Sequence, residues 1–183
     1  MKTIVLYKSK SGYTKTYAEW ISEALGCEMM ESSGVNPETL LEYDTIIYGG
    51  GLYAAGINGI ELITGKMDDL KGKNLVVWAT GSCRGTPEEQ EDIWSRNFTP
   101  EQRAVIKGYY LRSGFDYTKL NKVDKVLMSL LRAKLLLTPN RSEDQTGLLN
   151  AYKVPEYHCK RENIDELVAH VRGLEAISSQ TGS

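Results

Sequence analysis

The sequence is poor in cysteine and histidine, and it contains no long apolar run. Its three cysteines, Cys27, Cys83 and Cys159, are odd in number and widely spaced, and 183 residues include only two histidines. This count argues against a disulfide framework and a zinc cluster, so we predict no metal site and a reducing, cytoplasmic setting. No apolar run approaches the roughly 18 residues of a membrane span, and we expect no transmembrane segment.

An excess of charge of either sign is also missing. The 22 basic and 24 acidic residues leave a formal net charge of −2, which gives no electrostatic footprint for nucleic-acid binding. A content of 41% hydrophobic and 25% charged residues is typical of a folded globular domain. The length suits one domain, which we place at residues 1–175, with a flexible polar tail at 176–183.

Short β-branched runs alternate along the chain with segments of helical periodicity. The expected strands are 3–7, 27–31, 45–48, 74–80 and 105–111, and the main expected helices are 14–25, 59–66, 87–97 and 163–174. Such alternation is typical of a parallel sheet with helices on both faces. We therefore predict an α/β fold with a doubly wound five-stranded parallel sheet of order 2-1-3-4-5.

A polar loop follows the first expected strand and reads Ser9-Lys10-Ser11-Gly12-Tyr13-Thr14. It offers three hydroxyl donors, a glycine for a tight turn, and the N-terminus of a helix that Thr14 is expected to cap. These groups suit a terminal phosphate held end-on, with added charge from Lys10 and, unless it is solvated, Lys15. The spacing matches neither a Walker loop nor the dinucleotide-binding fingerprint. A plain solvated turn is the alternative, which the position after a strand disfavours.

This loop resembles the phosphate loop of the flavodoxin family. Ser9, Ser11, Gly12 and Thr14 match the family pattern Ser/Thr-x-Thr/Ser-Gly-x-Thr, and the resemblance covers the expected sheet, about residues 1–111 and 163–174. It implies a flavodoxin-like fold and a non-covalent FMN cofactor whose phosphate lies on residues 9–14.

Two further loops are expected to hold the flavin ring, because ligands of such sheets lie beyond the carboxyl ends of the strands at the switch point. The expected cofactor-binding residues there are Gly50, Gly51, Leu52, Tyr53 and Ala54 in one loop, and Thr80, Gly81, Ser82 and Cys83 in the other. Tyr53 is the candidate for stacking on the ring. Cys83 is interpreted as a small packing residue rather than a redox-active thiol.

The resemblance also implies that the Gly51–Leu52 peptide rotates to accept a hydrogen bond from reduced flavin. Family members usually carry an aromatic residue in the second loop, whereas this chain has none between Thr80 and Glu91. One face of the ring is therefore expected to be open, or to be covered by another segment.

About fifty residues, 112–162, exceed what this fold requires, and we define them as the insert. They contain an expected amphipathic helix, 119–137, with apolar positions Leu120, Val123, Val126, Leu127, Leu130, Leu131 and Leu135. We expect this stripe to pack on the sheet or over the flavin. Docking on a membrane surface or on a partner protein is the alternative.

Tyr109–Arg112, Phe115, Tyr117 and the apolar helix are similar to the branch of the family that includes menaquinone-dependent protoporphyrinogen dehydrogenase. The insert favours an FMN-dependent oxidoreductase, in which the flavin itself exchanges electrons with a small molecule or quinone. Protoporphyrinogen oxidation is one specific case. The alternatives are an electron carrier that docks a redox partner protein, and a flavin-free scaffold, against which the intact phosphate loop argues.

Overall fold

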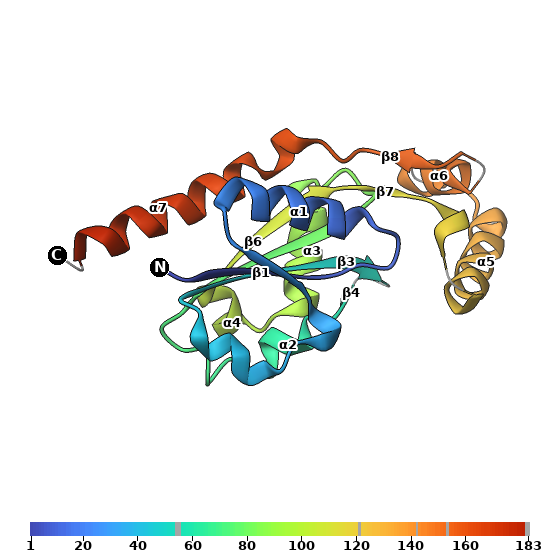
Figure 1. Ribbon diagram of the computed structural model, residues 1–183. Coiled ribbons are helices and arrows are strands. Elements are labelled where there is room, and N and C mark those ends of the chain that lie inside the picture. The colour runs from blue at the N-terminus through green and yellow to red at the C-terminus, as the bar shows by residue number, and fades with distance from the viewer. Residues whose placement is uncertain (54–55, 121, 142, 153, 182–183) are drawn as a thin grey trace.

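A parallel sheet forms the centre of the molecule in a computed structural model that describes residues 1–53, 56–120, 122–141, 143–152 and 154–181 (Figure 1). The strands are β1 (Thr3–Lys8), β2 (Glu28–Glu31), β3 (Thr45–Tyr53), β5 (Asn74–Gly81) and β6 (Ile106–Arg112). Their order within these ranges is β2-β1-β3-β5-β6, and β4 (Gly56–Ile57) pairs antiparallel with the end of β3. The predicted α/β class and the order 2-1-3-4-5 are confirmed, since β5 and β6 are the fourth and fifth expected strands.

Two layers of helices cover the sheet because successive side chains of a strand point to opposite faces. In β1, Val5 and Tyr7 join the core on one face, and Ile4 and Leu6 join the core on the other. The first face is covered by α1 (Tyr13–Leu25), η4 (Arg161–Ile164) and α7 (Asp165–Thr181). The second face is covered by η2 (Pro37–Glu42), α2 (Glu61–Thr64) and α3 (Pro87–Asn97).

Several element boundaries follow the local signals in the sequence. Helix α1 ends at Gly26, which caps it in the left-handed conformation at φ +63°, and α3 has the predicted bounds and begins with a capping box at Thr86. The remaining short elements are η1 (Ser32–Gly34) and α4 (Pro100–Val105). The sequence reading missed α4, although Thr99 starts it with a second capping box.

Other boundaries differ from the expected ones. Helix α2 is shorter than the expected 59–66, and α7 continues to Thr181, so residues 176–181 of the expected tail are helical. Strand β3 does not end at Tyr48 but continues through the three glycines to Tyr53. The reason is that Gly49 and Gly50 pair with strands on both sides, β1 and β5. At Gly49 a Cβ would overlap the indole of Trp78, its neighbour in β5. These glycines therefore allow close packing within the sheet.

The insert forms a separate lobe beyond the carboxyl ends of the strands (Figure 1). Its elements are β7 (Gly114–Phe115), η3 (Tyr117–Lys119), α5 (Lys122–Leu137), α6 (Glu143–Ala151) and β8 (Glu156–Tyr157). Strands β7 and β8 pair antiparallel, and this ribbon carries the chain out of the sheet and back. The ring centroids of Phe115 and Tyr117 lie 5.5 and 5.2 Å from that of Tyr152, whose hydroxyl donates to the Met128 carbonyl oxygen. The lobe is thus held together partly by its own aromatic residues.

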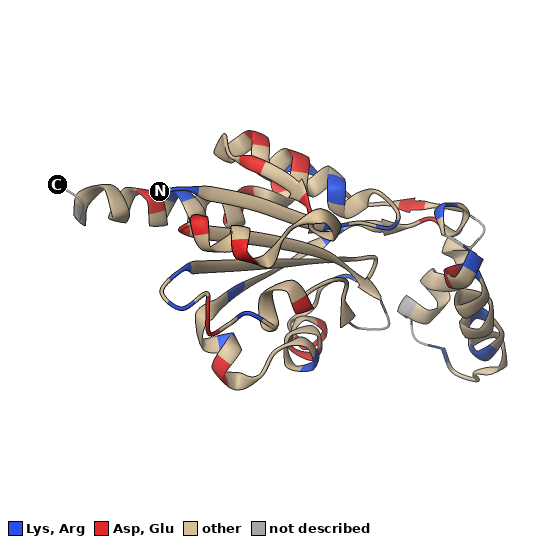
Figure 2. Cartoon of the chain, turned by 60° about the horizontal axis from the view of Figure 1, so that its bottom comes forward, with Lys and Arg blue, Asp and Glu red and all other residues tan. Residues whose placement is uncertain are grey.

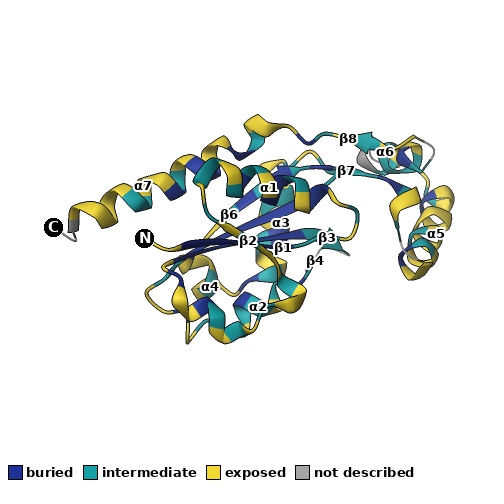
Figure 3. Ribbon diagram, in the orientation of Figure 1, coloured by how far each residue is buried: buried dark blue, intermediate teal, exposed yellow. Residues whose placement is uncertain are grey.

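The expected packing of the apolar stripe on the sheet is wrong. Val123, Val126 and Leu130 remain 68%, 61% and 64% exposed, and much of α5 carries the colour of exposed residues in Figure 3. The physical reason is that α1, α7, α2 and α3 already occupy the two faces of the sheet, while the ribbon carries α5 beyond its edge. Another part of the stripe covers the carboxyl ends of the strands, as the following section describes. No helix of the described ranges is long and apolar enough to cross a membrane.

Candidate functional site

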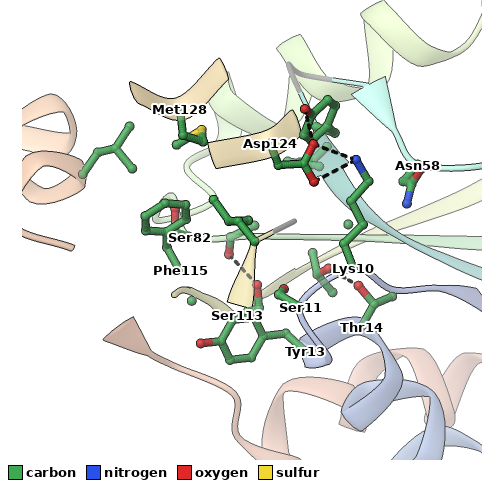
Figure 4. A pocket seen from close by; sticks show the side chains of 18 of the residues that line it. Lys10, Ser11, Tyr13, Thr14, Asn58, Ser82, Ser113, Phe115, Asp124 and Met128 are labelled. Atoms are coloured by element: carbon green, nitrogen blue, oxygen red, sulfur yellow. Dashed lines mark hydrogen bonds and ion pairs between the residues drawn. The ribbon is translucent and has the colours of Figure 1, made fainter. Parts of the chain in front are cut away.

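A cavity of about 570 Å³ lies between the carboxyl ends of the strands and the insert (Figure 4). Its volume is in the range of about 300–1,000 Å³ that small-molecule sites occupy. Ten of the residues expected to bind the cofactor line it, namely Lys10, Ser11, Tyr13, Thr14, Gly51, Leu52, Tyr53, Thr80, Gly81 and Ser82. Segments that lie far apart in the sequence therefore meet at one site, as the switch-point rule predicts.

The loop between β1 and α1 has the shape of an anion-binding turn. Gly12 is the N-cap of α1 and adopts φ +92°, a left-handed conformation that favours glycine. Ser9 Oγ accepts a hydrogen bond of 3.1 Å from the Gly12 N–H, so Ser9 shapes the loop instead of lining the cavity. Thr14 was expected to cap the helix, and this is wrong, because it is the second helical residue. The free N–H groups and positive dipole end of α1 face the loop.

Thr14 turns its side chain inward to Thr80 at the end of β5. Their hydroxyl oxygens lie 2.8 Å apart, and the residues are only 3% and 4% exposed. We call residues 50–53 and 80–83, which are expected to hold the flavin ring, the first and second ring loops. A Cβ at Gly51 would lie 3.4 Å from Thr14 Oγ1, which places the backbone of the first ring loop beside this pair. Each hydroxyl has one hydrogen. If Thr80 donates to Thr14, the Thr14 hydrogen remains available to an anion in the loop.

The first ring loop is a β-hairpin and not an irregular loop. Leu52 pairs with Ile57, and the Gly51 carbonyl accepts a 3.0 Å hydrogen bond from the Asn58 N–H. Gly50 does not line the cavity, since a Cβ there would lie 2.7 Å from the Asn58 carbonyl oxygen. Rotation of the Gly51–Leu52 peptide would break the hydrogen bond to Asn58. Ala54 lies outside the described residues.

The second ring loop packs against Tyr110 of β6 and accepts a hydrogen bond from it. The Tyr110 hydroxyl donates to the Cys83 carbonyl oxygen at 2.9 Å and lies 2.9 Å from Cys83 Sγ, so the thiol faces Tyr110 and does not line the cavity. A Cβ at Gly85, where φ is +76°, would overlap the Tyr110 ring. Burial raises the pKa of Tyr110, which keeps its hydroxyl protonated as a donor. The sequence reading missed this support because Tyr110 lies on another strand.

The insert supplies the rest of the cavity wall. Apolar residues predominate in this wall, and they include Phe115, Leu120, Leu127, Met128 and Leu131. Phe115 provides an aromatic side chain that the second loop itself lacks (Figure 4).

Hydrogen bonds fasten the insert to the second ring loop and to the phosphate loop. Ser113 donates to the Gly81 carbonyl oxygen through its N–H at 2.7 Å and its hydroxyl at 3.2 Å. The Tyr13 hydroxyl donates to the Glu156 carbonyl oxygen at 3.2 Å. The second ring loop and the phosphate loop are therefore both hydrogen-bonded to the insert.

An ion pair crosses the cavity from the phosphate loop to α5. Lys10 Nζ lies 3.2 Å from both carboxylate oxygens of Asp124, which is 2% exposed. The Tyr53 hydroxyl donates to the same carboxylate, and this hydrogen bond raises the pKa of Tyr53. Lys10 Nζ also lies 3.6 Å from the centre of the Tyr53 ring. We call Lys10, Tyr53 and Asp124 the cavity bridge; Figure 4 labels Lys10 and Asp124 and marks the ion pair between them.

The cavity bridge changes the expected role of Lys10. Its ammonium group points across the cavity to Asp124, whereas the sequence suggested a contact with the phosphate. Lys15 pairs with Glu19 at 3.8 Å on the surface of α1, which is the solvated alternative. The sequence reading did not identify Asp124 as a site residue, although it is acidic in a helix with several basic residues.

The site as a whole fits a flat molecule with a terminal phosphate. One end offers hydroxyl groups and the start of a long helix, the middle is bounded by two backbone-rich loops, and the far wall is apolar. Among the described residues, no cluster of three histidine, cysteine or acidic side chains could hold a metal ion. The hydroxyl groups, the helix start and the two backbone-rich loops fit the groups of FMN, the cofactor that the sequence resemblance implies.

Comparison with known proteins identifies the family of the chain. A family model described as a flavodoxin domain matches residues 4–136. No curated protein matches the chain significantly. Similar solved structures include the two-electron reduced flavodoxin of Megasphaera elsdenii, with 17% identity and a TM-score of 0.44 over 60% of this chain and 85% of that one. Oxidised flavodoxin 2 of Bacillus cereus has 20% identity and a TM-score of 0.41 over 82% and 94%.

Proposed function

Since the chain belongs to the flavodoxin domain family, we propose that it is an FMN-dependent oxidoreductase that exchanges electrons with a small apolar molecule or a quinone. The observation that supports this proposal most strongly is the composition of the cavity. A phosphate loop forms one end, and the apolar side of the insert forms the other. A site built only to carry electrons to a protein needs no second, apolar compartment of this kind.

The phosphate of FMN would lie on the loop before α1. Ser11 and Thr14 would donate from their hydroxyls, and the first N–H groups of α1 would add further donors. The single compact cradle suits one phosphate and not the pyrophosphate of FAD. Bound FMN supplies one- and two-electron chemistry, while the protein binds and orients it.

The flavin ring would lie between the two ring loops. Gly51, Leu52 and Tyr53 would bound it on one side, and the backbone of Gly81 and Ser82 would face its pyrimidine end. The substrate would then occupy the space between the ring and α5, where Leu127, Met128 and Leu131 supply an apolar lining. The resemblance to the protoporphyrinogen dehydrogenase branch makes protoporphyrinogen one substrate to test beside quinones.

The first experiment identifies the cofactor and the acceptor. Mass spectrometry of the released cofactor should find FMN, and the reduced protein should transfer electrons to a water-soluble naphthoquinone. Met128→Gln should raise the KM for the quinone, because it places an amide in the apolar wall. Leu130→Gln is the matched control on the same helix, since Leu130 is 64% exposed. Finding FAD or no flavin, or an equal KM for both variants, would contradict the proposal.

A second candidate function is electron transfer to a protein partner through the outer face of α5. Val123, Val126 and Leu130 are exposed there, and Lys and Arg positions colour the same lobe blue in Figure 2. Such a face suits a partner with an acidic, partly apolar surface. Leu130→Gln distinguishes the two functions: it should slow electron uptake from a partner reductase but leave the quinone reaction unchanged. A loss of binding to anionic lipid vesicles would instead assign this face to a membrane surface.

A further inference from the structure

The cavity bridge joins three parts of the protein that lie far apart in the sequence. Lys10 belongs to the phosphate loop, Tyr53 to the end of β3, and Asp124 to α5 of the insert. Asp124 is 2% exposed, so its carboxylate is removed from water and depends on these partners. The bridge is therefore a specific electrostatic link between the insert and the proposed cofactor site.

A phosphate monoester in the loop would compete with Asp124 for Lys10. The phosphate carries about −1.5 to −2 charges at pH 7, whereas the carboxylate carries one. Lys10 is next in the chain to Ser11, which lines the cavity beside Thr14. Its long side chain can therefore reach either anion, and the dianion attracts the ammonium group more strongly.

The position of Lys10 also occupies a face of the Tyr53 ring. The ammonium nitrogen lies 3.6 Å from the ring centre, which is the distance at which a flat ring would stack. A flavin can stack on this face only after Lys10 has moved. The phosphate end and the ring end of FMN thus both favour the opening of the same ion pair.

We propose that the cavity bridge is a cofactor-responsive latch: Asp124 holds α5 over the site through Lys10 until FMN binds, and FMN then releases this hold. The inference rests on the proposed function, because it requires FMN in the cavity. Since Leu127 and Leu131 of α5 line the same cavity, release of Asp124 loosens the wall through which a substrate would enter. By thermodynamic linkage, docking of α5 then weakens FMN binding by the same factor by which FMN weakens the docking of α5.

The test is Asp124→Asn, which keeps the size of the side chain and can still accept a hydrogen bond from Tyr53 but loses the charge. FMN should bind at least about fivefold more tightly to this variant, the lower end of typical coupling between sites. Glu156→Gln is the matched control: it also removes a carboxylate from the insert, but Glu156 pairs with His158 and not with Lys10. Its affinity for FMN should equal that of the wild type.

Hydrogen exchange gives a second readout, measured in the wild type and compared with Asp124→Asn. FMN should accelerate amide exchange in α5 of the wild type and have little effect on α5 in Asp124→Asn, where the latch is already open. Equal or weaker FMN binding by Asp124→Asn, or protection of α5 by FMN in the wild type, would overturn the latch alone. If neither protein binds FMN, the proposed function fails and the latch fails with it.

Discussion

The Thr14–Thr80 hydroxyl pair offers a direct test of where the phosphate lies. The two oxygens are 2.8 Å apart and buried, and only Thr14 belongs to the phosphate loop. If Thr80 donates to Thr14, Thr14 can donate to the phosphate, so the pair acts as a short relay of hydrogen bonds. Substitution by valine removes each hydroxyl and nearly preserves the volume.

The two substitutions should have unequal effects on FMN. Thr14→Val removes a hydrogen bond to a charged group, which contributes about 1.5–3 kcal/mol. This loss weakens FMN binding by about tenfold to a hundredfold. Thr80→Val removes only the neutral hydrogen bond between Thr80 and Thr14. The loss of FMN-binding free energy should therefore be about 0.5 kcal/mol, the lower value for a neutral hydrogen bond, or roughly twofold in affinity. Quenching of flavin fluorescence in a titration measures both constants.

The same pair should show strong coupling in stability. Each single valine leaves the other hydroxyl buried without its partner, which costs about 1–3 kcal/mol, whereas the double variant leaves neither. The free energy of unfolding of Thr14→Val/Thr80→Val should therefore be higher than that of either single variant, as urea titrations can show. Equal loss of FMN affinity in the two single variants would refute the relay, and unchanged affinity in Thr14→Val would place the phosphate elsewhere.

Three further results are expected. In the FMN-loaded protein, reduction should accelerate exchange of the Asn58 amide, because rotation of the Gly51–Leu52 peptide breaks its hydrogen bond to the Gly51 carbonyl; equal rates in both redox states would argue against rotation. Gly49→Ala should lower the free energy of unfolding by about 1–3 kcal/mol or more through overlap with the Trp78 indole, while Gly147→Ala, with open space at its Cβ in α6, should be neutral or stabilising. Burial lowers the pKa of His170, with Lys107 contributing, so the stability that its neutral form supports should be lost as the pH falls below about 6.5. A comparison with His170→Phe in pH-dependent thermal unfolding should show this loss in the wild type only.

The sheet and the phosphate loop could be predicted because their signals are local. The run Thr3–Tyr7 is β-branched and apolar, and Gly12 follows it after a few polar residues. A strand, a glycine turn and a helix start are each set by neighbouring residues. The expected glycine turn between β1 and α1 is present, although Gly12 and not Thr14 is the N-cap, and the carboxyl ends of β1, β3 and β5 meet where the fold class requires.

Contacts between distant segments could not be predicted in the same way. Whether Gly49 ends a strand or lies within it depends on Trp78, which packs against it from the next strand. The direction of the Thr14 side chain depends on Thr80, 66 residues later. A pattern in the sequence shows that a glycine or a hydroxyl is unusual at a position, but only the tertiary structure supplies the partner that explains it.

The insert helix shows how a charged residue within an apolar pattern could have identified part of the site. An α-helix turns by about 100° per residue, so positions 124, 127 and 131 share one face and positions 123, 126 and 130 share a face next to it. The sequence combines these into one broad stripe, whereas the structure divides them between the cavity and solvent. Asp124 stands on the face that otherwise carries Leu127 and Leu131, and a carboxylate that is itself only 2% exposed requires a cation. Its partner Lys10 lies 114 residues away in the phosphate loop, so the need for a cation opposite Asp124 is the signal that connects the insert to the cofactor site.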